Sequence, residues 1–173
     1  MNLPNKLTLL RILLIPVCLL LWALGQPVCS AAVFGLAALT DFLDGHIARK
    51  QNIITVFGKF ADPVADKILV LTAMIFLCAD GRIPAWAVCV VAARELMVDG
   101  LRLVAVGKGT VIAAGWLGKI KTTLQFFCIL SAMLLPPGHW ITWTLVIAMT
   151  VMTVWSGAKY LWDHRETLAS GGM

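Results

Sequence analysis

Six long apolar stretches constrain this chain more than any other feature of its sequence. They cover approximately residues 9–25, 28–48, 60–79, 84–106, 117–135 and 140–161. A helix needs roughly 20 apolar residues to cross the hydrocarbon core of a bilayer, and lipid requires the backbone polar groups to be paired within the span. The sequence therefore predicts an all-α, polytopic membrane protein with six transmembrane helices and a short N-terminal interfacial segment.

Composition and charge placement narrow the class further. Of the 173 residues, 60% are hydrophobic and 13% are charged, whereas water-soluble domains carry roughly a quarter charged residues. All Lys and Arg residues except Arg82 lie at or nearest the side of the predicted bundle that holds the N-terminus. Because positive loops stay cytoplasmic, we expect both termini and the connections at 49–59 and 107–116 to face the cytoplasm. The net charge of +5 indicates topology and a lipid surface, and no nucleic-acid partner is expected.

Four aspartates at the ends of apolar stretches are the most informative polar residues. Asp41 and Asp44 end the second stretch three positions apart, and each faces the same side of a helix. Asp62 and Asp66 begin the third stretch four positions apart, again on one face. A turn over residues 50–57 would bring the two pairs together, and four converging carboxylates repel without cations between them. All-oxygen ligation selects a hard ion, which predicts two Mg²⁺ ions, with Mn²⁺ as the alternative.

Small residues and one arginine follow the first aspartate pair. Gly45 comes directly after Asp44, and Ala48 lies one helical turn beyond Asp44 on the same face, which clears space for a flat ligand. Arg49 offers a planar fork suited to a phosphate. Gly58, expected just before the third helix, would let the backbone approach a ligand closely. The pattern favours a flat, phosphate-bearing ligand beside the metal ions.

The run Asp41-Phe-Leu-Asp-Gly-His-Ile-Ala-Arg49, with Gly58, Asp62 and Asp66 after it, resembles the signature of the CDP-alcohol phosphatidyltransferases at every fixed position. The resemblance implies that Asp41 and Asp62 bridge two divalent ions. Asp44 would complete one ion site and Asp66 the other, and Asp66 would also be the general base on the acceptor hydroxyl. By the same resemblance, the cytidine and its diphosphate are seated by Gly45, Ala48, Arg49 and Gly58.

Other segments resemble one branch of that family, the bacterial phosphatidylglycerophosphate synthases. They are residues 2–11, 62–67, 94–102 and 115–123. This resemblance implies a single membrane domain over residues 1–173, with Asn5 and Thr8 added to the site for the CDP-linked lipid. It also implies CDP-diacylglycerol as donor, sn-glycerol 3-phosphate as acceptor, and CMP as the second product. A homodimer in the bacterial inner membrane, with its active site facing the cytoplasm, is expected on the same ground.

Basic residues near the cytoplasmic ends of the fourth and fifth stretches are candidates for binding the acceptor phosphate. They are Arg94, Arg102, Lys119 and Lys121. Positive-inside topology alone would also place basic residues there, but Arg94 sits mid-helix and so needs a partner or a ligand. Its neighbour Glu95 is a competing explanation, although adjacent helical residues point to different faces. Asp99 departs from the family pattern, where a small residue is expected, and its charge would disfavour a phosphate if it faced the acceptor.

Two alternatives follow from the same residues. The chemistry could act on another acceptor, namely inositol phosphate, serine or phosphatidylglycerol. Intramembrane aspartates also line the permeation paths of metal-ion transporters. Against a transporter, the four carboxylates cluster near one membrane face, and the sequence shows no inverted repeat.

Overall fold

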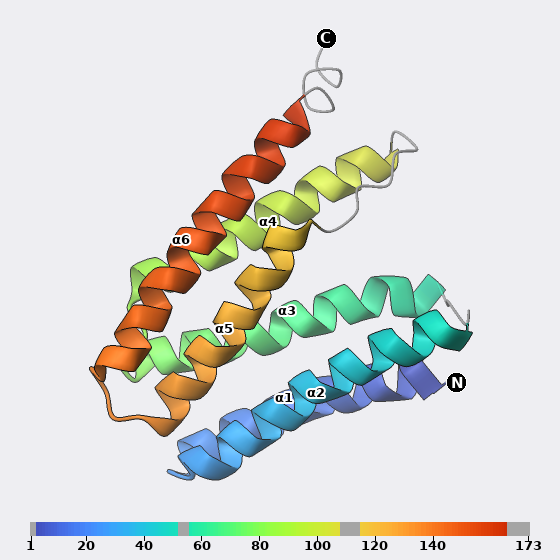
Figure 1. The fold of residues 1–173 in the computed structure, drawn as a ribbon. Coiled ribbons are helices and arrows are strands. Elements are labelled where there is room, and N and C mark those ends of the chain that lie inside the picture. Colours follow the sequence, from blue (N-terminus) through green and yellow to red (C-terminus); the bar gives the residue numbers. More distant parts are fainter. Residues whose placement is uncertain (1–2, 52–55, 108–114, 166–173) are drawn as a thin grey trace.

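A computed structural model of the chain describes the backbone of residues 3–51, 56–107 and 115–165, and the side chains of residues 9–40, 64–107 and 115–165. This part of the chain is all-helical (Figure 1). Its six helices are α1 (Leu3–Ala23), α2 (Pro27–Gln51), α3 (Val56–Ala79), α4 (Ala85–Gly107), α5 (Trp116–Leu134) and α6 (Trp140–Asp163). The predicted all-α class is confirmed, and each helix coincides with one of the six apolar stretches.

Two helices begin earlier than the apolar stretches indicated. Helix α1 starts at Leu3, so the segment expected to be a separate interfacial piece is continuous with the first helix. Helix α3 starts at Val56. Gly58 therefore lies inside the helix, whereas the sequence predicted it just before the helix. Hydropathy marks only the part of a helix that suits lipid, whereas the helix itself continues into polar sequence wherever hydrogen bonding does.

The membrane character of the helices differs. Among the described residues, α5 and α6 are long and apolar enough to cross a membrane, and shorter apolar helical portions cover 9–23 and 27–40. Helix α4 carries four charged residues between its middle and its C-terminal end, namely Arg94, Glu95, Asp99 and Arg102. Those charges all belong to the polar cluster described below.

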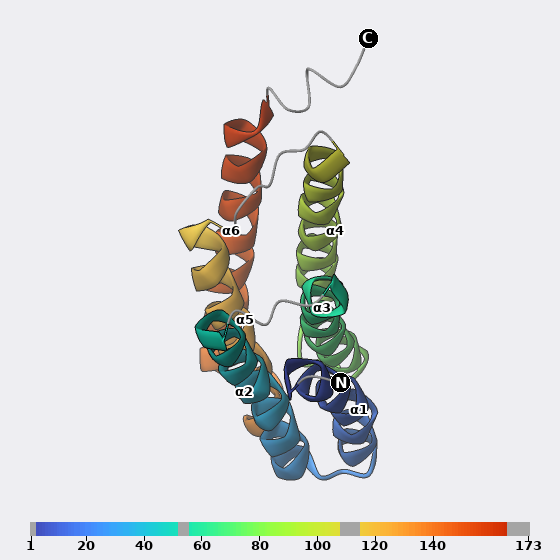
Figure 2. The same ribbon diagram turned by 90° about the vertical axis from the view of Figure 1, so that its right-hand side faces the viewer.

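The helices converge at one end of the bundle and diverge toward the other (Figures 1 and 2). We call the converging end, which holds the short connections at 24–26, 80–84 and 135–139, the turn end. The diverging end, where α1, α3 and α5 begin and α2, α4 and α6 end, is called the pocket end. Helix α1 packs on α2 and α3, α5 packs on α6, α2 and α3, and α4 packs on α6 and α3.

The main apolar core fills the half of the bundle nearer the turn end. Its largest fully buried side chains include Phe34, Met74, Leu77, Ile129 and Met149. A second, smaller cluster joins α4 to α6 nearer the pocket end and consists of Val98, Leu101 and Tyr160, with Leu161 beside them. The apolar core thus holds the helices together at one end and leaves polar interior surface at the other.

Candidate functional site

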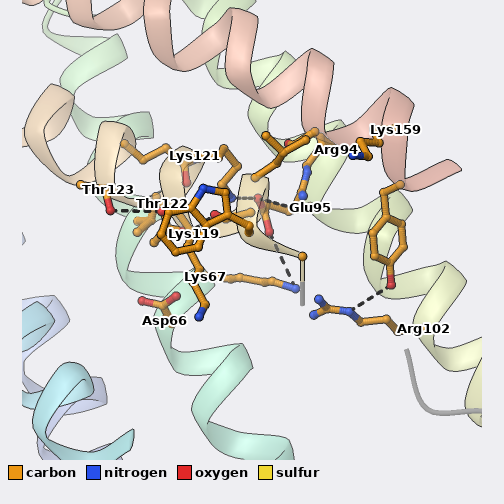
Figure 3. Close-up of a pocket in the computed structure, with 18 of the residues that line it drawn as sticks. Asp66, Lys67, Arg94, Glu95, Arg102, Lys119, Lys121, Thr122, Thr123 and Lys159 are labelled. Atoms are coloured by element: carbon orange, nitrogen blue, oxygen red, sulfur yellow. Dashed lines mark hydrogen bonds and ion pairs between the residues drawn. The ribbon is translucent and has the colours of Figure 1, made fainter. Parts of the chain in front are cut away.

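A pocket of about 910 Å³ lies in the pocket half of the bundle, between α3, α4, α5 and α6 (Figure 3). Its basic lining residues are Lys67, Arg94, Arg102, Lys119, Lys121 and Lys159. Its acidic lining residues are Asp66, Glu95 and Asp163. Basic side chains therefore outnumber acidic ones by two to one, so an anion is the class of ligand that this lining favours.

Glu95 is the buried acid at the centre of this lining. Its carboxylate pairs with Lys121 from α5, lies 3.4 Å from Nη1 of Arg94, and lies 3.9 Å from Nζ of Lys67 on α3. The side chains of Glu95 and Lys121 are only 9% and 6% exposed. Because buried charges are tolerated only when they are paired, Glu95 allows three helices to bring cations to one place (Figure 3).

Arg94 has a hydrogen-bond donor that its contact with Glu95 does not engage. Within the described part of the chain, its buried Nε has no hydrogen-bond partner. Two glycines flank the side chain: a Cβ added to Gly157 on α6 would lie 3.1 Å from Cγ of Arg94, and one added to Gly118 on α5 would lie 4.0 Å from Nη2. The absence of side chains at these glycines lets the arginine lie between α5 and α6.

The other basic residues lie nearer the rim. Nε of Arg102 donates to the hydroxyl of Tyr160 at 3.3 Å, which links α4 to α6. Lys119 is exposed, and its Nζ lies 6.0 Å from the ring centre of Trp116. The pocket thus has buried cations inside and more accessible ones at its edge.

Asp99, the residue that departs from the family pattern, does not line the pocket. Its carboxylate forms an ion pair with Lys67, and its side chain is 39% exposed. The negative charge is therefore directed at a lysine, which removes the conflict with a phosphate ligand that a pocket-facing acid would cause.

The structure brings together five of the residues singled out from the sequence. Asp66, Arg94, Arg102, Lys119 and Lys121 all line the pocket. The side chains of the others lie outside the described residues: Asn5, Thr8, Asp41, Asp44, Gly45, Ala48, Arg49, Gly58 and Asp62. Among the side chains that are described, no group of three or more His, Cys, Asp or Glu residues is placed to hold a metal ion.

Sequence reasoning missed or misjudged three buried polar residues. Glu95 and Arg94 were expected to face different sides of α4, but their side chains are long enough to meet at 3.4 Å. Gln125, 2% exposed, lines the pocket but was not singled out, since a lone glutamine in an apolar stretch has no motif. Arg11 was counted as a topology charge and as the last residue of the 2–11 segment, but its complete burial in α1 was not expected.

Comparisons of the sequence with known proteins identify a family. Residues 1–155 match the family model described as CDP-alcohol phosphatidyltransferase. The chain is 41% identical to a CDP-diacylglycerol–glycerol-3-phosphate 3-phosphatidyltransferase of Bacillus subtilis (strain 168), over 96% of this chain and 98% of the relative. Proteins of the same name from Salmonella choleraesuis (strain SC-B67) and Escherichia coli (strain K12) are each 38% identical, over 96% of this chain and 97% of theirs. The chain belongs to the CDP-alcohol phosphatidyltransferase family.

Proposed function

We propose that this enzyme transfers the phosphatidyl group of CDP-diacylglycerol to sn-glycerol 3-phosphate, giving phosphatidylglycerol phosphate and CMP. The observation that carries the acceptor is the cationic lining of the pocket, with six basic and three acidic side chains. A phosphate monoester supplies the negative charge and the acceptor oxygens that such a lining lacks. The relatives are named for the same acceptor.

The acceptor phosphate is assigned to Arg94, Arg102, Lys119 and Lys121. Burial gives these residues different parts in binding. Arg94 and Lys121 are the more buried, which strengthens their attraction to an anion because little water screens them. Arg102 and the exposed Lys119 lie where an incoming phosphate first meets the protein.

Two divalent ions, Mg²⁺ or Mn²⁺, are assigned to Asp41, Asp44, Asp62 and Asp66. The family is metal-dependent, and carboxylate oxygens are the ligands that such hard ions prefer. Asp66 lines the pocket. Helices α2 and α3, which carry the four aspartates, pack against each other. The four carboxylates therefore belong to neighbouring helices and form an all-oxygen donor set, which suits such ions. When bound, they would stabilise negative charge on the reacting phosphate.

The chain's own residues then act on the two substrates. Gly45, Ala48, Arg49 and Gly58, with Asn5 and Thr8, are assigned to the CDP-linked lipid. Asp66 accepts the proton of the terminal acceptor hydroxyl, and the freed oxygen attacks the phosphorus joined to diacylglycerol. The bond from that phosphorus to the CMP oxygen breaks, so CMP leaves as the phosphatidyl group is transferred.

The setting that we propose is the bacterial inner membrane. All six helices would span it, with the pocket end toward the cytoplasm, because the basic residues other than Arg82 gather at or nearest that side. The soluble acceptor would then enter from the cytoplasm while the lipid donor stays in the bilayer. A homodimer is expected from the family resemblance, and light scattering of the detergent-purified protein would test it.

The decisive experiment supplies acceptors one at a time to purified protein with CDP-diacylglycerol and Mg²⁺. CMP release should depend on glycerol 3-phosphate and should stop when EDTA removes the divalent ions. Faster release with inositol phosphate, serine or phosphatidylglycerol would replace the proposed acceptor. Metal flux into proteoliposomes without any CMP release would favour the transporter alternative.

A further inference from the structure

Gln125 is a buried polar residue to which the proposed chemistry gives no task. It lies on α5, is 2% exposed, and lines the pocket. Its side-chain Nε2 finds no hydrogen-bond partner among the residues that the structure describes. Most buried side-chain polar groups in proteins are paired, so an amide donor left open at a pocket wall points to a ligand that completes it.

The surroundings of Gln125 indicate what kind of ligand this is. Lys121 lies one helical turn earlier on α5 and therefore on the same helix face. Nε of Arg94, on α4, is the other open donor among the described lining residues of the pocket. Two open donors and a buried ammonium on one pocket fit the oxygen atoms of an anion.

We propose that Gln125 is a specificity-determining residue, whose Nε2 donates a hydrogen bond to a phosphate oxygen of the acceptor bound beside Arg94. This inference rests on the proposed function, because it needs the acceptor phosphate to occupy this pocket. A neutral amide donates a directional hydrogen bond and adds no charge to the pocket. It therefore favours ligands that place an oxygen atom at the right position, whereas the surrounding cations attract any anion.

Thr142 provides a matched control. It is the other uncharged side chain in the described part of the chain that is buried with an unpartnered polar atom, its Oγ1. It lies near the start of α6, toward the turn end, and does not line the pocket. Thr142 and Gln125 thus share an open buried polar group and differ in whether a ligand can reach it.

The test compares Gln125→Met with Thr142→Val in steady-state assays and in thermal unfolding. Methionine keeps the length of glutamine and removes the open donor, so the melting temperature should stay the same or rise. The KM for glycerol 3-phosphate should rise about fivefold or more, while the KM for CDP-diacylglycerol stays within twofold. Thr142→Val should change neither KM.

A second variant guards against a folding defect. Gln125→Glu keeps the size of the side chain and places a carboxylate where a donor stood, so it should raise the acceptor KM further by repelling the phosphate. An unchanged acceptor KM in both Gln125 variants, with the wild type active on glycerol 3-phosphate, would overturn the inference and leave the proposed function standing. A wild type that ignores glycerol 3-phosphate would overturn the proposed function itself.

Discussion

Arg82 and Arg94 lie in opposite halves of the molecule and use the same side chain differently. Arg82, in the α3–α4 connection at the turn end, donates from Nη1 to the carbonyl oxygens of Ala132 and Leu135 at 2.9 and 2.8 Å. Its guanidinium also lies 4.9 Å from the ring centre of Trp22. These bonds tie the connection to the C-terminal end of α5, where a cation also complements the helix dipole.

Arg94 is held more loosely. Its contact with Glu95 is 3.4 Å long, and Nε stays open among the described residues. The arginine at the turn end has thus committed its guanidinium to the fold, whereas the arginine in the pocket keeps donors for a ligand. Arginines in an apolar helical bundle can therefore serve the fold or a ligand, and the hydrogen-bond donors that each has left open separate the two roles.

The largest difference in kcat is expected between substitutions of an acid at the pocket end and an acid at the turn end. Asp66→Asn should lower kcat by about 10²- to 10⁴-fold, because the general base is lost, and should leave the fold intact. Asp80→Asn removes an acid at the turn end, where Asp80 accepts from Nε1 of Trp22 at 2.8 Å, and should leave kcat unchanged. CMP release and circular dichroism would measure both variants. Wild-type turnover in Asp66→Asn would remove Asp66 from the mechanism.

The two arginines themselves should separate activity from stability. Arg94→Met should lower kcat/KM for glycerol 3-phosphate by about 10- to 100-fold, the value of a charge-assisted hydrogen bond, with little change in melting temperature. Arg82→Met loses two such bonds and should lower the melting temperature by about 5 °C or more, while the folded fraction keeps its kcat/KM. If both substitutions changed kcat/KM and the melting temperature equally, Arg94 would not be a ligand-binding residue distinct from the structural Arg82.

A smaller effect should follow from crowding Arg94. Gly157→Ala places a Cβ 3.1 Å from Cγ of Arg94, which is tight enough to displace the arginine by a few tenths of an ångström. We expect an increase of about two- to fivefold in the acceptor KM, since misplaced binding groups lose part of their hydrogen-bond energy. Gly35→Ala on α2 meets nothing within 4 Å and should stabilise the helix slightly. An unaltered acceptor KM in Gly157→Ala would mean that Arg94 adjusts without cost.

The all-helical fold was predictable because each long apolar stretch is a local signal in the sequence. Each apolar stretch became one helix, and the errors at Leu3 and Val56 arose where helices continue into polar sequence. Asp66, Arg94 and Lys121 were each named from the sequence, and they line one pocket. Their roles stay predictions, made because family motifs and isolated charges in apolar sequence are candidate functional positions.

The ion pairs between the pocket's lining residues, and the burial of those residues, could not be predicted in the same way. Glu95 acts as the shared partner of Lys67, Arg94 and Lys121 only because α3 packs against both α4 and α5. That arrangement depends on tertiary packing. Gln125 stands out only once its burial is known. Residue type and spacing identify which groups are costly to bury, but helix packing decides which groups meet.

The smallest effect is expected at Asp99, where the sequence pattern gave the strongest reason to question a phosphate acceptor. Asp99 pairs with Lys67 at the outer side of the charge cluster and is partly exposed, and exposed ion pairs contribute about 1 kcal/mol or less. Asp99→Ser should therefore change the acceptor KM by no more than about twofold, because Lys67 can shift toward Glu95, 3.9 Å away. A KM for glycerol 3-phosphate that fell tenfold would show that the charge of Asp99 reaches the acceptor. The pocket end would then hold an acid that opposes its ligand, in contrast to the turn end, where Asp80 only accepts a hydrogen bond from Trp22.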